Sequence, residues 1–202
     1  MRRSRSRLAF VAASLGLSAP LAGQTTGEVT EGGAAFLLIA VGARATALGQ
    51  AGIADARSAD AAFWNPAGLA LLPQSQVVVH HAATFASNNT VLSGYLASSL
   101  VGVVGLAAYL VDYGSQDIVP GPQQPPTGRI TPRNIELVAS YATSLSRSFT
   151  VGVNYKLIQL RNDCSGDCGA FRSIVGTTHG VDLGVQYGAE DPEGLEGFDV
   201  RH

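Results

Sequence analysis

The sequence predicts an all-β protein, an antiparallel transmembrane β-barrel that is incomplete in this chain. Three observations lead to this prediction. Apolar and polar residues alternate with a period of two in several segments, which is the pattern of strands with one apolar face. These segments are about ten residues long, the length of a tilted strand that crosses a bilayer. Short and long connections alternate between them, as in bacterial barrels with short periplasmic turns and longer external loops.

The composition is that of a folded protein with little surface charge. Of the 202 residues, 46% are apolar and 14% are charged, whereas a typical soluble domain has about 25% charged residues. The formal charge is −2 and no basic run occurs outside residues 2–7, which excludes a nucleic-acid-binding protein. No uninterrupted apolar stretch is long enough for a membrane-spanning helix.

Residues 1–23 are predicted to be a signal peptide, cleaved between Ala22 and Gln24. The basic stretch RRSRSR is followed by the apolar stretch LAFVAASLGL and then by small residues, which is the layout of a secretory signal. Together with the predicted barrel, this signal places the protein in the cell outer membrane, exported through the inner membrane.

Residues 24–73 are predicted to form an N-terminal plug or lead-in segment before the first strand. The segment is rich in Ala and Gly and is broken at Asn65-Pro66 and at Leu72-Pro73. We expect irregular chain here, with short helical turns near residues 43–48 and 58–63.

Residues 74–202 are predicted to hold six strands of the incomplete barrel and the start of a seventh at 198–201. Three strands alternate clearly: 134–145, 148–157 and 180–187. Three alternate more weakly: 76–85, 90–100 and 102–113. The connections at 115–133 and 162–178 are long and polar, so we expect them to be external loops.

The alternation assigns side chains to two faces. The apolar set of the three clearest strands is expected to face lipid. The polar set, Glu136, Asn154, Lys156, Asp182 and Gln186, is expected to share one wet interior. On this interpretation the substitution Asn154→Ala should be mild.

Residues 35–72 resemble the N-terminal signature of the PorV/PorQ family of outer-membrane proteins, which is related in fold to FadL-type fatty-acid transporters. The matching pieces are Phe36-Leu37 with VGARA at 41–45, LGQAG at 48–52 and WNPAGL at 64–69. The motif residues are Gly42, Arg44, Gly49, Trp64, Asn65, Pro66 and Gly68. The segment AAYLVDYGSQDI at 107–118 also resembles the family's third strand. Unlike the family's adjacent acids, Asp55 and Asp60 are separated.

The resemblance implies a FadL-like barrel of about fourteen strands, and six strands cannot close around an interior. We therefore expect this chain to be a C-terminally truncated member or a gene fragment. The implied function is transport, or the handling of cargo in the manner of a type IX secretion shuttle. The implied partners are outer-membrane lipid and secretion-system components or secreted cargo. Two alternatives remain open: a FadL-like channel for hydrophobic small molecules, and a soluble secreted β-sheet protein with an adhesive role.

No residue pattern indicates an enzyme, a cofactor site or a metal site. The motif WNPAG is interpreted as a sharp turn that leads into the first strand. Arg44 is expected to be buried in an ion pair with Asp55 or Asp60. His80 and His81 point to opposite faces of a strand and cannot hold one metal together. Cys164 and Cys168 are separated by three residues, and export favours a disulfide between them.

Overall fold

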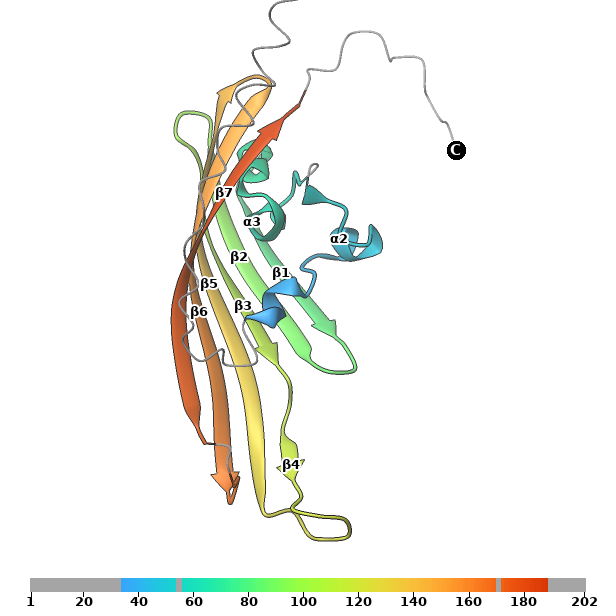
Figure 1. Cartoon of the computed structure of the whole chain (residues 1–202). Coiled ribbons are helices and arrows are strands. Elements are labelled where there is room, and N and C mark those ends of the chain that lie inside the picture. The colour runs from blue at the N-terminus through green and yellow to red at the C-terminus, as the bar shows by residue number, and fades with distance from the viewer. Residues whose placement is uncertain (1–33, 54–55, 170–171, 189–202) are drawn as a thin grey trace, which may run out of the picture. The chain divides into compact units, whose positions relative to one another are not determined.

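The computed structural model describes residues 34–53, 56–169 and 172–188. Within them, the strands form one antiparallel sheet, and the short helices gather on one side of it (Figure 1). The expected signal peptide and the strand start expected at 198–201 lie outside the described residues. None of the helices in the described part of the chain has the length and hydropathy needed to cross a membrane.

We call residues 34–72 the lead-in segment, and the helices assigned within its described residues are short. They are η1 (Ala35–Leu38), α2 (Ala43–Ala47), α3 (Ala61–Trp64) and η3 (Pro66–Leu71). Glycines with positive φ, Gly42 at 93° and Gly49 at 60°, flank α2 and keep it short. Pro66 begins η3, where its missing N–H is not needed. The helical turns expected near 43–48 and 58–63 are therefore present.

The sheet contains six long strands and one short one. They are β1 (Gln76–Ala83), β2 (Asn88–Ser98), β3 (Gly102–Asp112), β4 (Gln116–Ile118), β5 (Gly128–Ser146), β6 (Phe149–Gly166) and β7 (Ile174–Tyr187). The strand order is β1-β2-β3-β5-β6-β7, and β4 pairs with the start of β5. Among the described residues the sheet is open, with β1 and β7 at its edges.

Side chains of each strand alternate between two faces, as the period-two pattern predicts. The inner face is the one that the lead-in segment covers, and it buries Tyr95, Tyr109 and Val138 to 2% exposure or less. The outer face carries the predicted apolar set, including Leu183 at 82% exposure and Tyr187 at 74%. The hydrophobic core of the described chain therefore lies between the lead-in segment and the inner face.

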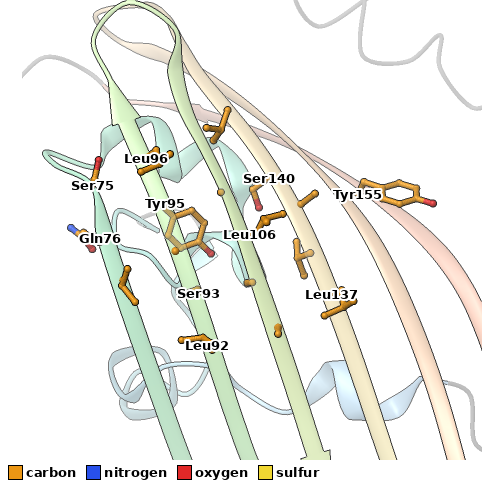
Figure 2. A pocket seen from close by; sticks show the side chains of 18 of the residues that line it. Ser75, Gln76, Leu92, Ser93, Tyr95, Leu96, Leu106, Leu137, Ser140 and Tyr155 are labelled. Atoms are coloured by element: carbon orange, nitrogen blue, oxygen red, sulfur yellow. The ribbon is translucent and has the colours of Figure 1, made fainter.

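The outer face is a wide apolar surface. Figure 2 shows Leu92, Leu96, Leu106 and Leu137 spread over β2, β3 and β5, where the surface forms a hollow of 1040 Å³. Soluble monomers rarely expose an apolar patch larger than a few hundred Å², and larger patches mark contact with membranes or other proteins. Together with the open antiparallel sheet, this surface confirms the predicted class, a transmembrane β-barrel that is incomplete here.

Three strands are longer than the alternation predicted. β5 begins at Gly128, β6 continues to Gly166 and β7 begins at Ile174, and β4 lies inside the expected loop 115–133. The loops expected at 115–133 and 162–178 are thus reduced to 119–127 and 167–173. The prediction missed these extensions because the outer-face residues of β5, β6 and β7 become polar in this part of the sheet. The period-two hydrophobic pattern therefore disappears there.

A row of charged side chains marks the end of the apolar band on the outer face. Asp112, Arg133 and Arg161 lie opposite one another on β3, β5 and β6, and Arg133 pairs with Asp112. Below this row the outer side chains of β5 are apolar or small from Leu145 to Ile135, a length of about ten residues that matches a membrane-spanning strand. The paired ends of β5 and β6 extend beyond this band.

Candidate functional site

Asn65 of the WNPAG motif ties the lead-in segment to the sheet. Its side-chain Nδ2 donates to the carbonyl of Val185 on β7 at 3.1 Å and to the carbonyl of Ile53 at 3.3 Å. Its Oδ1 accepts from the backbone N–H of Ala67 at 3.2 Å and caps η3. The motif does form a turn, as expected, and it also attaches the lead-in segment to the sheet.

A pair of glycines on the inner face receives the motif. Gly152 of β6 and Gly184 of β7 lie directly opposite each other. A Cβ atom at Gly152 would overlap the backbone of Pro66 and lie 2.5 Å from the nitrogen of Ala67. A Cβ atom at Gly184 would lie 2.8 Å from Cδ of Pro66 and overlap the side chain of Asn65. We call this pair the glycine notch.

Three other motif residues, Trp64, Gly68 and Gly42, hold the lead-in segment together. The indole Nε1 of Trp64 donates to the carbonyl of Val41 at 3.0 Å. A Cβ atom at Gly68 would overlap the carbonyl oxygen of Ala56, so only glycine allows this contact between two backbone stretches. Gly42 similarly leaves room for the carboxyl group of Asp60. These motif residues therefore allow two stretches of the lead-in segment to pack closely against each other.

Arg44 is exposed and not buried as expected, whereas its expected ion pair with Asp55 or Asp60 stays a prediction. The exposure follows from its place on α2, because Ala45 is the residue of this short helix that turns toward the core. Arg44 and Asp60 line the same cavity of 180 Å³, and Asp55 lies outside the described residues. The carboxyl group of Asp60 also contacts Nε2 of His80 on β1 at 2.5 Å. This contact is a further link between the lead-in segment and the sheet.

The two adjacent histidines do point to opposite faces. His80 reaches the lead-in segment, whereas His81 contacts Thr90 of β2 on the other side of the sheet. Among the described residues, no group of three or more metal-binding side chains comes together.

The inner face also carries a buried polar network. Asn154 is 0% exposed; its Nδ2 donates to the carbonyl of Ala62 at 2.6 Å and to Asp182 at 3.1 Å. Ser140 donates to Oδ1 of Asn154 at 2.8 Å. The ammonium group of Lys156 lies 3.0 Å from Glu136 and 2.9 Å from Asp182. The network spans β5, β6 and β7 beneath the lead-in segment.

The network corrects the expectation of a wet interior at these positions. Glu136, Asn154, Lys156, Asp182 and Gln186 do share the inner face, but Glu136 is 1% exposed and Asn154 is fully buried. The lead-in segment, which the strand pattern cannot place, excludes water from Glu136 and Asn154, whereas the side chain of Asp182 stays 39% exposed. We therefore expect Asn154→Ala to destabilise the protein, and not to be mild, because the substitution leaves the carbonyl of Ala62 without its buried donor.

Sequence reasoning missed the glycine notch and the role of Asn154. A usable signal was present: Gly152, Asn154, Gly184 and Asp182 all fall on the small and polar side of two neighbouring strands. Period-two alternation alone could not show that the small residues form a docking surface, because it does not reveal what lies above them.

The disulfide lies at the end of the sheet that holds the connections 119–127 and 167–173. Cys164 and Cys168 are joined, with their Cα atoms 6.3 Å apart. The loop after β6 packs against the residue before β5, since the N–H of Asp167 donates to the carbonyl of Thr127 at 3.0 Å. Nearby, Asp117 of β4 accepts a hydrogen bond from Arg129, which raises the pKa of the Arg129 guanidinium group. This end of the sheet is thus held by covalent and ionic contacts.

We predict that both cysteines are oxidised in the exported protein. Alkylation of the denatured chain without reductant should add no mass, and alkylation after reduction should add two groups. Two free thiols before reduction would contradict the prediction.

A family model described as type IX secretion system protein PorV matches residues 22–202. The chain belongs to the PorV family. The match covers both the lead-in segment and the sheet, as the resemblance of residues 35–72 implied. No curated protein matches the chain. As a PorV-family protein, the chain is a type IX secretion-associated protein of the outer membrane, and PorV is a family of secretion-system proteins and not of enzymes.

Proposed function

We propose that this chain supplies the plug-bearing wall of an outer-membrane barrel that handles exported proteins in type IX secretion, as a shuttle for its substrates. The observation that supports the proposal is the contrast between the two faces of the sheet. The outer face is apolar and uncovered, as a lipid-facing surface must be. The inner face carries the docked lead-in segment and, on β5, β6 and β7, a network of polar and charged side chains. In this proposal the lead-in segment is the plug.

The domain division follows from the same proposal. Residues 1–23 act as the signal peptide, residues 24–73 form the plug, and residues 74–202 form the wall. Outer-membrane lipid contacts the outer face, while secretion-system components or secreted cargo meet the protein from the lumen or from its external end.

Deletion of the gene in its own host tests the shuttle function. Proteins that carry type IX secretion signals should then accumulate in the periplasm and be lost from the cell surface and the medium. Expression of the wild-type chain at its native level should restore their export. Unchanged export in the deletion strain would overturn the proposal.

The same strain tests the FadL-like alternative. A channel for hydrophobic small molecules needs an apolar lumen, whereas the inner face here carries Glu136, Lys156 and Asp182. Uptake of a labelled long-chain fatty acid should therefore be the same with and without the gene. A loss of fatty-acid uptake with normal protein export would favour the channel.

For the adhesive alternative, the native protein would partition into the aqueous phase on detergent extraction.

We also predict the orientation of the sheet. The connections 119–127 and 167–173 lie at one end of the antiparallel sheet, and the short turns 99–101 and 147–148 lie at the other. A membrane-impermeant maleimide applied to intact cells should label Gln124→Cys and not Arg147→Cys. Labelling at position 147 alone would reverse the orientation.

A further inference from the structure

A second cavity, of 230 Å³, lies between the lead-in segment and the inner face. Its walls include the apolar and aromatic side chains of Ile39, Phe63 and Trp64 from the lead-in segment, with Gln50 of the same segment as a polar neighbour. Three polar side chains of the sheet, Tyr109, Glu136 and Lys156, line it from the other side. The volume is below the range of about 300–1,000 Å³ that drug-sized ligands occupy, so the cavity fits only a small molecule.

The hydroxyl group of Tyr109 points to a ligand. Tyr109 is 2% exposed, and no described residue forms a hydrogen bond with its hydroxyl group. A buried hydroxyl group without a partner is costly, and such groups in native structures usually have a bound water, ion or ligand as their partner. Glu136 lies directly opposite Tyr109 on the neighbouring strand, and both side chains belong to the inner face.

The charges around the cavity favour a cation. Lys156 is shared by two carboxylates, those of Glu136 and Asp182, which leaves one excess negative charge in this group. Glu136 is 1% exposed, and Lys156 is the only described residue that pairs with it. An additional cation beside Glu136 would balance the charge, and the aromatic rings of Phe63, Trp64 and Tyr109 add a surface that attracts cations.

We propose that this cavity binds a small primary ammonium ion with a short apolar chain. The ammonium group donates to the carboxylate of Glu136 and to the hydroxyl oxygen of Tyr109. The apolar chain lies along Ile39, Phe63 and Trp64. This binding site is independent of the proposed shuttle function, because it needs only the docked lead-in segment and the inner face.

The chain contains a single tryptophan, Trp64, so its fluorescence reports on this cavity. The full chain, purified in an uncharged detergent, is titrated with butylammonium, and with butanol and butyrate as neutral and anionic controls. We expect a saturable change in Trp64 fluorescence with butylammonium and none with butyrate. Nα-acetyl-lysine amide tests whether the same group is accepted on a polypeptide: a saturable change extends the site to lysine side chains, and none restricts it to free amines.

Two tyrosine variants separate binding from folding. Tyr109→Phe removes an unpartnered hydroxyl group, so it should leave the unfolding midpoint unchanged and weaken butylammonium binding by about tenfold, the effect of one hydrogen bond to a charged group. Tyr95→Phe removes a buried hydroxyl group outside this cavity and should leave binding unchanged. Equal affinities for butylammonium, butanol and butyrate, or no saturable change with butylammonium, would overturn the proposal.

Discussion

Gly152→Ala is expected to undock the lead-in segment from the sheet. The added methyl group would overlap the backbone of Pro66 and Ala67. Neither this part of the lead-in segment nor β6 can move freely. Asn65 and Asn154 fix the lead-in segment to β7 and β6 on either side of the notch. Overpacking of this kind costs about 1–3 kcal/mol, and we expect the upper end of that range because the clash is with backbone.

The loss of stability is measured by denaturant unfolding in detergent. Undocking is measured by limited proteolysis of residues 34–72, with Trp64 fluorescence as a local probe. Gly176→Ala on β7 is the matched control, because a Cβ atom there meets nothing within 4 Å. The control should unfold at the wild-type midpoint and resist proteolysis. Equal behaviour of the two variants would show that the glycine notch does not hold the segment.

Val153→Arg is expected to destabilise the protein in a bilayer by roughly 2–4 kcal/mol. Val153 lies on the outer face of β6 within the apolar band and is 37% exposed. An arginine there brings a charge into the hydrocarbon region without a partner. The measurement is reversible unfolding of the chain in lipid vesicles.

Gln159→Arg serves as the control on the same strand and the same face. Position 159 lies close to Arg161, which belongs to the charged row at the end of the band. The cost near the membrane boundary is only about 0–1 kcal/mol. If both variants lose the same free energy of unfolding, the outer face at position 153 does not contact lipid.

The strands within the apolar band could be predicted from the sequence, and their extensions could not. Val181, Leu183, Val185 and Tyr187 alternate with small or polar residues because the two faces of the strand have different surroundings, one of them the docked lead-in segment. Beyond the band the outer face carries charged and polar residues such as Arg129, so the alternation of apolar and polar residues is lost there. Strand pairing there comes from register continued from the band and from the contacts of β4 and the disulfide loop.

The docking of the lead-in segment on the sheet could not be predicted from the sequence pattern either. The motif WNPAG indicated a turn from local chemistry, since Asn and Pro favour turns. Its partners Gly152, Asn154 and Gly184 lie far away in the sequence, so that only tertiary packing brings them together. The same packing makes Asn154 a buried anchor where alternation alone predicted a solvated side chain.

The central claim is that the two faces of this sheet meet lipid and the barrel interior. Spin labels at two adjacent positions of β7 test it most directly: Val181→Cys on the outer face and Gly180→Cys on the inner face, in the full chain in lipid vesicles. The native cysteines, being paired, do not react with the label. The label at 181 should be relaxed by oxygen, which concentrates in the hydrocarbon core, and shielded from a water-soluble nickel complex, whereas the label at 180 should show the reverse. Two labels that are both shielded from oxygen and from nickel would place β7 inside a packed soluble protein and contradict the account.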